Sequence, residues 1–350
     1  MLNKLLSKFS HDIGIDLGTA NTLVYLRGRG LVIDEPSVVA INQKTKQILE
    51  IGQKAKQMVG KTPANIVATR PLVDGVVSDF EITEQMIKHF IELLHKQNFA
   101  LLPRPRVVIG IPSGVTEVEK RAVIDAAANA GARQAFLIEE PMAAAIGVGL
   151  EIQEATGQII VDIGGGTSEV AVISLGGIVA SQSLRIAGDE LTNDIVNYAK
   201  EEFGLLVGER TAEEIKISIG SACNIGKLEE ASIRGRDIIT GLPKELIITP
   251  DQAREAISKS VRSIVESVKI TLEETPPELI SDIMRQGIWL AGGGALLKGL
   301  DQVIARETGI PVHIGEDPLR AVVRGTGLVL DDLDNLSQVL IGNDLGQEYS

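Results

Sequence analysis

Two stretches of the chain share one pattern, IGIDLGTANT at residues 13–22 and IIVDIGGGTS at residues 159–168. Each is an apolar strand that ends in an aspartate, followed by a glycine-rich turn with hydroxyl side chains and a second apolar strand. Glycine lets the backbone approach an anion and turn its N–H groups toward it. An aspartate at the strand end suits a divalent cation that neutralises phosphates. The repeat therefore predicts two facing hairpins that bind one nucleoside triphosphate.

The composition is typical of a folded protein of about two domains. The chain has 350 residues, of which 44% are hydrophobic and 36 are glycines, and this length suggests roughly two domains. A net charge of −13 and an aromatic content of 3% argue against basic, base-stacking surfaces. We therefore expect no nucleic-acid partner.

The cysteine count, the spacing of the histidines and the length of the apolar runs indicate where the protein is located and argue against a zinc site. Cys223 is the only cysteine, so no internal disulfide can form and a reducing compartment is expected. The four histidines are scattered without ligand spacing, which argues against a zinc site. No apolar run approaches the ~18–20 residues of a membrane span, and the N-terminus lacks the apolar core of a secretion signal. These features predict a cytoplasmic protein.

Strands and helices alternate in both halves of the chain, which predicts an α/β protein. Helical spacing predicts helices at residues 81–94, 117–130, 142–149 and 250–272. Thr211 and Glu214 have the spacing of a capping box for a further helix. Because the repeated pattern starts each half, we expect two duplicated helix-flanked sheet domains around a cleft. The acidic, weakly patterned stretch from Asp331 to Ser350 is expected to be a frayed tail.

A third glycine-rich segment, Gly292-Gly293-Gly294, follows a predicted strand at residues 287–291. A helix is expected from Ala295 onward, and its N-terminus would offer free N–H donors to a ligand. On their own these glycines are more typical of a tight strand–helix turn; beside two phosphate hairpins, we favour a role at the sugar and base. The site is not of the Walker type, because Gly220 to Lys227 has one residue too many between its glycines.

Hydrolysis of a triphosphate needs a cation, an aligned water and a group that orients this water. Asp16 and Asp162 are the cation candidates, acting partly through water because magnesium keeps much of its hydration shell. Glu140 stands between a short strand and the helix that Pro141 opens, which is a rigid position for orienting a water. The alternative is that Glu139 and Glu140 only favour the helix dipole, at ~0.3–1 kcal/mol each.

Four motifs, in this order and at workable spacing across about residues 12–330, resemble the actin/Hsp70/sugar-kinase superfamily. They are DLGTANT at residues 16–22, EPMAAA at 140–145, DIGGGT at 162–167 and AGGG at 291–294. Four further segments resemble the MreB family of bacterial actins: IEEPMAAAIG at 138–147, EPSVVA at 35–40, PLVDGV at 71–76 and RGTG at 324–327. The resemblance implies an ATP-dependent filament that hydrolyses ATP slowly and organises cell-wall growth and rod shape.

The resemblance also implies roles for single residues. Mg²⁺ would be held by Asp16 and Asp162, and Glu140 with Thr167 would position the water, so that Glu140, Thr167 and Asp162 form the catalytic set. Of the binding residues, Glu213 and Lys216 would lie by the adenosine, although an ordinary amphipathic helix explains this pair equally well. The expected nucleotide-binding residues are Gly18, Thr19, Ala20, Asn21, Gly164, Gly165, Gly166, Thr167, Gly188, Glu213, Lys216, Gly292, Gly293, Gly294 and Ala295.

The actin-like fold implied by the resemblance gives each domain a smaller subdomain. The expected divisions are a first domain at residues 11–150 with its smaller subdomain at about 35–75, a second domain at 151–330 with its smaller subdomain at about 190–250, a segment at about 318–335 that returns to the first domain, and an acidic tail at 336–350.

The first ten residues have the pattern of a small cationic amphipathic helix. Its apolar face comprises Leu2, Leu5, Leu6 and Phe9, with Lys4 and Lys8 off this face. Each apolar side chain contributes at most ~1.5–3 kcal/mol, so a membrane would bind one copy weakly and a row of copies along a filament tightly. The alternative is a helix packed on the protein itself. The resemblance adds a membrane contact at Leu101 and Leu102, for which a partly buried loop is an equally fair account.

Two other functions would use the same cleft. A small-molecule kinase needs its own base near the γ-phosphate, and no convincing candidate beyond Glu140 is apparent. An Hsp70-type chaperone ATPase needs a separate peptide-binding domain, which we do not expect in a chain of 350 residues. The expected partners are further copies of the chain in paired protofilaments, the inner face of the cytoplasmic membrane and, by resemblance, the cell-wall elongation machinery.

Overall fold

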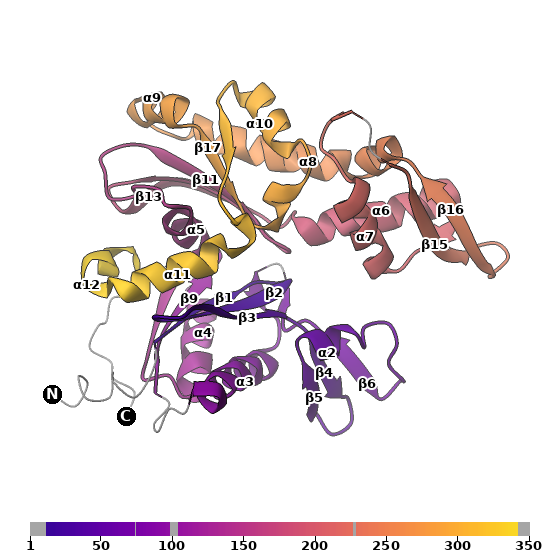
Figure 1. Ribbon diagram of the computed structural model, residues 1–350, viewed down its shortest axis with the longest axis horizontal. Coiled ribbons are helices and arrows are strands. Elements are labelled where there is room, and N and C mark those ends of the chain that lie inside the picture. The colour runs from indigo at the N-terminus through magenta and orange to yellow at the C-terminus, as the bar shows by residue number, and fades with distance from the viewer. Residues whose placement is uncertain (1–11, 74, 99–103, 227–228, 342–350) are drawn as a thin grey trace. The chain divides into compact units, whose positions relative to one another are not determined.

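The computed structural model describes residues 12–73, 75–98, 104–226 and 229–341, and its contacts divide the chain into two compact units (Figure 1). Unit 1 takes the residues up to 155, residues 173–178 and those from 319 onward, and unit 2 takes residues 156–172 and 179–318. Each unit has its own cluster of buried apolar side chains.

Unit 1 is built on a five-stranded sheet with the strand order β10-β9-β1-β2-β3. Its strands are β1 (Ile13–Leu17), β2 (Asn21–Leu26), β3 (Gly30–Pro36), β9 (Arg106–Ile111) and β10 (Gln134–Glu139). β1 and β2 form an antiparallel hairpin in which Asp16 lies opposite Leu23, whereas β1, β9 and β10 run parallel. Residues 107–111 of the interior strand β9 are all buried, as expected for a strand that is covered on both faces.

Three helices follow the strands of this sheet, α3 (Phe80–Asn98), α4 (Glu117–Asn129) and α5 (Glu140–Val148). They confirm the predicted helices. α4 begins at a capping box in which the Thr116 hydroxyl accepts a bond from the Glu119 N–H and the Glu119 carboxylate accepts one from the Thr116 N–H. α5 has Pro141 in its first turn, where the missing N–H costs nothing, and ends at Gly149 in the left-handed region at φ 87°.

A small sheet with the strand order β5-β4-β6 belongs to the same unit. We call residues 38–70 the β4–β6 module; it contains β4 (Val39–Asn42), β5 (Ile48–Ile51), the short helix α2 (Gln53–Lys56) and β6 (Ile66–Thr69). Val38, Ala40 and Ala55 form its own small apolar cluster. A two-stranded hairpin of β7 (Leu72–Val73) and β8 (Val76–Val77) follows it.

Unit 2 repeats the strand order of unit 1. Its five-stranded sheet runs β13-β12-β11-β17-β18, from β11 (Gln158–Ile163), β12 (Ser168–Ser174), β13 (Gly177–Leu184), β17 (Ile288–Ala291) and β18 (Val312–Ile314). β11, β17 and β18 run parallel, as β1, β9 and β10 do. The duplicated sequence pattern therefore occupies the same place in two sheets of equal topology.

The remaining elements of unit 2 are helices and a second small sheet. They are α6 (Gly188–Phe203), α7 (Glu209–Ile219), α8 (Pro250–Glu273), α9 (Pro277–Gln286), α10 (Leu300–Thr308) and the sheet β14-β15-β16, from β14 (Leu205–Leu206), β15 (Ala231–Asp237) and β16 (Pro243–Ile248). α8 begins at a capping box of Thr249 and Gln252, which confirms the predicted start of this helix.

Two predicted helix starts in unit 2 are wrong. α7 begins at Glu209 after Gly208, which makes no side-chain cap, so Thr211 already lies in the first turn and caps nothing. After the glycines, Gly293–Leu296 form a short 3₁₀ turn, and α10 begins only at Leu300. The reason is Leu297, whose extended backbone at ψ 118° ends the 3₁₀ turn; the chain enters α10 only after Gly299, which is left-handed at φ 75°.

The stretch after residue 330 is also more ordered than predicted. α11 (Ala321–Asp331), α12 (Leu333–Leu336) and the 3₁₀ turn Ser337–Val339 carry the chain on to Ile341. The Ile341 N–H donates to the Leu137 oxygen of the edge strand β10 at 2.9 Å, and Val339 and Leu340 are buried. The expectation of a frayed tail is therefore wrong for residues 331–341, and residues 342–350 lie outside the described part of the chain.

A buried aspartate anchors the first strand of unit 1. Asp12 accepts bonds from the Arg106 main chain at 3.1 Å and side chain at 3.0 Å, and pairs with Arg27 and Arg133 at 3.4 Å. Burial raises the pKa of Asp12, but the Arg106 bonds and charge, with the charge of Arg133, outweigh it and hold this pKa below its ordinary value of 3.8. The ion pairs thus fix the end of β1 that lies away from Asp16.

Helices α5 and α11 touch through their main chains. A Cβ on Gly147 of α5 would overlap the Ala321 oxygen, and a Cβ on Gly325 of α11 would overlap the Ala143 oxygen. The contact is reciprocal: the glycine of each helix lies on the carbonyl group of an alanine in the other helix, and this alanine comes four residues before that helix's own glycine. The Arg324 side chain also donates to the Gly147 oxygen. This contact fixes α5, whose first residue is Glu140.

We expect Gly325→Ala to lower the free energy of unfolding by about 2 kcal/mol or more, because the added methyl group overpacks the contact with α5. Urea unfolding followed by circular dichroism measures the effect. Gly208→Ala is the matched control, since a Cβ there meets no atom within 4 Å. Equal midpoints for the two variants would contradict the close contact.

Candidate nucleotide-binding site

The turn between β1 and β2 is held in place by hydrogen bonds that its carbonyl oxygens accept. The Ser37 hydroxyl donates to the Gly18 oxygen at 2.6 Å, and the Ser37 N–H donates to the Ala20 oxygen at 3.0 Å. The Thr22 hydroxyl lies 2.9 Å from the Ser37 hydroxyl, and both residues are fully buried. Gly18 has no room for a side chain, because a Cβ would lie 2.8 Å from the Asn21 oxygen.

The N–H groups of this turn face no acceptor in the part of the chain that the structure describes. Among the described residues, those of Gly18, Thr19 and Ala20 donate no hydrogen bond. The Thr19 hydroxyl accepts a bond from the Gly75 N–H at 3.1 Å, which ties the turn to the β7–β8 hairpin. A turn with bonded carbonyls and available N–H groups is a concave site for an anion.

The turn between β11 and β12 has the same arrangement with different partners. The Gly164 N–H donates to the Thr167 oxygen at 2.9 Å and closes the turn. The Gly164 and Gly165 oxygens accept bonds from the main-chain N–H groups of Gly188 and Asp189 at 3.1 and 2.8 Å. Within the described ranges, the N–H groups of Gly165, Gly166 and Thr167 donate no hydrogen bond. The first N–H groups of α6 therefore hold the carbonyl oxygens of this turn, as Ser37 holds those of the turn in unit 1.

Lys216 of α7 lies at the start of α6. Its ammonium group donates to the Gly188 oxygen at 2.7 Å and to the Thr192 hydroxyl at 2.8 Å. Glu213 lies one turn earlier on α7 and is half-buried. Lys216 thus bonds to Gly188, and Gly188 in turn donates to Gly164 of the second turn. An amphipathic helix alone would not require this contact.

The two aspartates occupy equivalent positions on the two hairpins. Asp16 lies opposite Leu23, and the bond that closes the Gly164–Thr167 turn sets Asp162 opposite Glu169. Desolvation of its carboxyl group raises the pKa of Asp16 to about 7, since burial disfavours the charged form. Asp162 is 5% exposed.

The carboxylates beside these turns suit Mg²⁺, which also binds phosphate and water, better than they suit a metal ion held only by protein side chains. The described residues contain no group of three or more side chains that could hold a metal ion. Mg²⁺ usually binds one or two carboxylates together with phosphate oxygens and water. In each unit taken by itself, an aspartate beside N–H groups that suit phosphate offers one such carboxylate.

The parallel strands of unit 1 bring Glu140 to the same sheet edge as Asp16. Asp16 pairs with Gly110, and Gly110 pairs with Ile138, so β10 ends and α5 starts at this edge. Glu140 is 9% exposed, and a Cβ on Gly110 would lie 3.6 Å from its Cγ. In unit 2, Asp162 pairs with Ala291, and this brings the third glycine segment beside the second turn.

The third glycine segment packs on the end of β11. A Cβ on Gly292, which has a φ of 76°, would overlap the Ile163 oxygen and the Asp162 carboxylate, and one on Gly294 would overlap the Ile163 side chain. The tight-turn alternative therefore accounts for these two glycines. Gly293 is exposed and Ala295 is buried; the expected helix N-terminus at Ala295 is absent, because α10 starts at Leu300.

Sequence reasoning missed two residues of the site. Ser37 stood only inside a resemblance motif, and no local signal shows that it bonds a turn 19 residues away. Glu169 is 1% exposed and accepts a bond from the Ser183 hydroxyl at 2.7 Å. A charged residue within the apolar strand SEVAVIS was the signal that could have found it.

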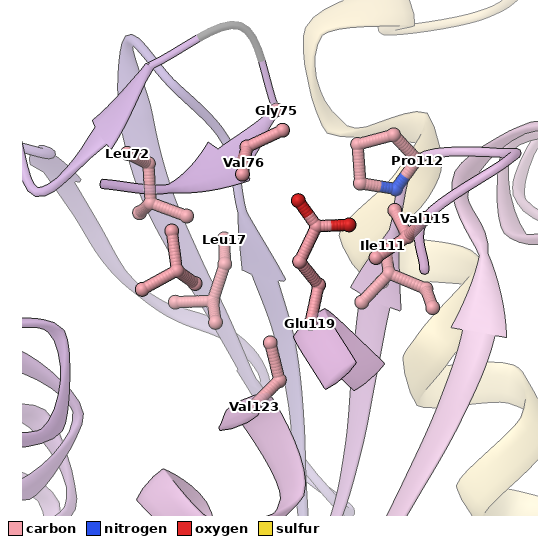
Figure 2. Close-up of a pocket in the computed structure, with 11 residues that line it drawn as sticks. Leu17, Leu72, Gly75, Val76, Ile111, Pro112, Val115, Glu119 and Val123 are labelled. Carbon is pink, nitrogen blue, oxygen red and sulfur yellow. The ribbon is translucent and has the colours of Figure 1, made fainter. Parts of the chain in front are cut away.

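A small pocket adjoins the first turn in unit 1 (Figure 2). Leu17, Leu72 and Val123 line it, and the Glu119 carboxylate lies near Pro112. This carboxylate accepts bonds from the Thr116 N–H and hydroxyl at 2.8 and 2.6 Å. The pocket is mostly apolar, so it supplies no phosphate ligands of its own.

The residues expected at the membrane lie outside the described part of the chain. They are Leu2, Leu5, Leu6, Phe9, Leu101 and Leu102. In the ranges that the structure describes, no helix is both long enough and apolar enough to cross a bilayer.

Comparison with known proteins finds a family and close structural neighbours. A family model described as MreB/Mbl protein matches residues 10–338. Cell shape-determining protein MreB of Escherichia coli K12 is 50% identical over 352 residues, covering 99% of this chain and all of that protein. The crystal structure of MreB5 of Spiroplasma citri bound to ADP has a TM-score of 0.89 at 39% identity and covers 94% of this chain and 98% of its own. The same protein bound to AMPPNP gives a TM-score of 0.88 and covers 93% and 97%. The predicted actin-like fold is confirmed.

We expect Ser37→Ala to weaken nucleotide binding about tenfold, which corresponds to ~1.4 kcal/mol, because the Gly18 carbonyl loses its donor and the turn its fixed geometry. Calorimetric titration with Mg-ATP measures the affinity. Ser78→Ala is the control, since it also removes a hydroxyl bond to a main-chain oxygen, that of Pro71 at 3.0 Å. A folded Ser37→Ala protein with wild-type affinity would disprove the role of Ser37.

Proposed function

Because the chain belongs to the MreB/Mbl family and is thus a cell shape-determining cytoskeletal protein, we propose that it binds Mg-ATP through its two hairpin turns. It would hydrolyse ATP slowly and polymerise into filaments on the inner face of the cytoplasmic membrane. The two domains would be those expected from the sequence, each with a smaller subdomain.

One observation carries this proposal: the two hairpin turns have bonded carbonyls, available N–H groups and an aspartate at the same register position. In each turn, available N–H groups suit phosphate oxygens, and the carboxylate beside them suits a cation. The MreB5 structures with ADP and AMPPNP support a nucleoside di- or triphosphate as the ligand.

Each residue has a definite task in the proposed reaction. The turn N–H groups bind the phosphate oxygens, and Asp16 and Asp162 hold the cation, which would neutralise phosphate charge. Lys216 adds positive charge beside Gly188 and, with Glu213, stands at the adenosine. Glu140 accepts a hydrogen bond from the attacking water, and Thr167 orients this water through its hydroxyl group. Burial of Glu140 keeps its carboxylate in one position.

Membership of a cell shape-determining family favours a filament over the small-molecule kinase. A polymer also explains the amphipathic N-terminus, because many weak anchors along one filament bind a membrane together. The cell-wall elongation machinery is then the partner that such a filament would organise.

We expect the wild-type protein to sediment at high speed when Mg-ATP is added. The Glu140→Ala variant should still bind ATP and sediment, but it should release phosphate at least ~100-fold more slowly, because the water loses its orienting group. Sedimentation, calorimetry and a phosphate-release assay on one preparation measure the three properties.

Asp162→Ala is the comparison variant, and it should lose Mg-ATP binding itself. A wild-type protein that never sediments with Mg-ATP would contradict the filament. Unchanged phosphate release by Glu140→Ala would contradict only the role of Glu140.

Deletion of residues 1–10 should abolish flotation with liposomes and leave ATP-dependent sedimentation unchanged, since the anchor is separate from the nucleotide site. Leu6→Glu should act in the same way, because a carboxylate on the apolar face opposes insertion. Lys8→Gln, which leaves that face intact, should retain most of the binding. Flotation that survives the deletion would place the anchor elsewhere.

A further inference from the structure

Arginine side chains gather at one end of the five-stranded sheet of unit 1. Strands β1, β9 and β10 run parallel and start at this end. Arg106 is the first residue of β9, and Asp12 and Arg133 come just before β1 and β10. Strand β2 runs antiparallel to β1 and ends here, which brings Arg27 to the same place. We call Arg27, Arg106 and Arg133 the arginine cluster; it lies at the opposite end of β1 from the candidate nucleotide site.

The arginine cluster has more cationic than anionic groups. Its three guanidinium groups surround the buried Asp12 carboxylate, with Arg106 at 2.5 Å and Arg27 and Arg133 at 3.4 Å. Arg27 also pairs with Asp331 at 3.3 Å. Two carboxylates therefore face three guanidinium groups, which leaves an excess of positive charge on a chain whose net charge is −13. Such a surface attracts an anionic partner.

Two of the arginines have hydrogen-bond donors to spare. Arg133 donates from Nη2 to the Asp12 carboxylate, and its buried Nε has no acceptor among the described residues. Arg106 uses Nε and Nη2 on the same carboxylate, so its Nη1 bonds to nothing in the ranges that the structure describes. Both oxygens of Asp12 already accept bonds. Proteins give most buried polar groups a partner, so the arginine cluster lacks an acceptor that a ligand could supply.

The arginine cluster reaches the surface. The side chains of Arg27, Arg106 and Arg133 are 40%, 24% and 11% exposed. Arg104, two residues before Arg106, is exposed and adds a further positive charge at the same end of the sheet. A guanidinium group matches the geometry of a phosphate group, which it binds through two parallel N–H bonds. The ligand that fits this surface is therefore an anion with a phosphate group.

We propose that the arginine cluster, with Arg104, binds the phosphate group of an anionic phospholipid. The inference rests on the proposed function, since it names the lipid chemistry that the protein meets at the membrane. The two segments expected at the membrane, residues 1–10 and residues 101–102, join the described chain at residues 12 and 104. Anchors attached at these points would hold the arginine cluster at the level of the headgroups, where an anionic leaflet attracts arginine side chains. A lipid is therefore favoured over a soluble phosphate.

Vesicles of two compositions test the proposal. We expect the full chain to bind vesicles that contain phosphatidylglycerol at least about tenfold more tightly than vesicles of phosphatidylcholine alone. Arg104→Gln with Arg133→Gln should lower the affinity for the anionic vesicles about tenfold. The same variant should bind the neutral vesicles like wild type, because the apolar anchors are unchanged. Flotation at a series of lipid concentrations measures both affinities.

Arg210→Gln with Arg306→Gln in unit 2 is the matched control, since it removes the same charge from side chains that are 78% and 66% exposed. This control should keep the wild-type affinity for both kinds of vesicle. Thermal unfolding shows whether each variant is folded. If Arg133→Gln destabilises the chain, Arg104→Gln alone changes an exposed side chain and should still lose about threefold. An equal loss in the control, or folded variants that bind like wild type, would overturn the proposal.

Arg104→Lys with Arg133→Lys separates recognition of phosphate from general attraction. Both charges remain but the planar forks are gone, so this variant should lose about threefold in affinity for the anionic vesicles. Unchanged affinity would contradict a phosphate site.

Two further outcomes would also overturn the lipid site. One is that inorganic phosphate raises the thermal midpoint of the wild type but not of Arg104→Gln with Arg133→Gln, while both proteins bind vesicles equally; the ligand would then be a soluble phosphate. The other is a wild type that binds neutral and anionic vesicles equally, which would leave the proposed membrane association intact. A wild type that binds neither kind would remove that association together with this inference.

Discussion

The candidate site depends on hydrogen bonds to the carbonyl oxygens of two hairpin turns. A free turn can rotate its peptide groups, and each peptide that turns its oxygen toward an anion converts attraction into repulsion. Ser37 prevents this rotation at Gly18 and Ala20, and the first N–H groups of α6 prevent it at Gly164 and Gly165. The N–H groups are therefore aimed before any ligand arrives, so that binding need not order them.

Both copies of the hairpin have bonded turn carbonyls, but different residues make these bonds. A buried hydroxyl begins the second strand in both: Thr22 lies beside Ser37, and Ser168 donates to the Ile186 oxygen at 2.7 Å. Opposite the aspartate the copies differ, with Leu23 in unit 1 and the buried Glu169 in unit 2. The second copy thus holds more negative charge beside its aspartate. Duplication preserved the geometry of the turn and left its charge free to diverge.

Most of the architecture could be predicted because its signals are local. Glycine in the turns, aspartate at the strand ends and helical spacing such as that of residues 250–272 act within a few residues. The errors arose where distant contacts decide. Gly299, the left-handed residue at which α10 begins, packs against Cys223, which lies 76 residues earlier. Val339 and Leu340 stand in an acidic stretch and are nonetheless buried, next to Ile341, which pairs with Leu137 of β10 about 200 residues earlier in the chain.

The same distinction holds within the site. The turns, both aspartates and the position of Glu140 at a strand end follow from local pattern and parallel pairing. Ser37 does not, because a serine on its own has no preference for a turn that precedes it by a whole hairpin. Gly292 and Gly294 were assigned to a ligand, yet the atoms they approach belong to Ile163 and Asp162. Their first physical task is packing.

The pairing of Ile341 with Leu137 has a practical consequence for studies of assembly. β10 ends its sheet, and a bare sheet edge readily pairs with strands of other molecules. Truncated versions of the chain that lack residues 337–341 would bare this edge together with the apolar sites of Val339 and Leu340. Such proteins would pellet as amorphous β-aggregates, and a centrifuge alone would not distinguish these from ordered filaments.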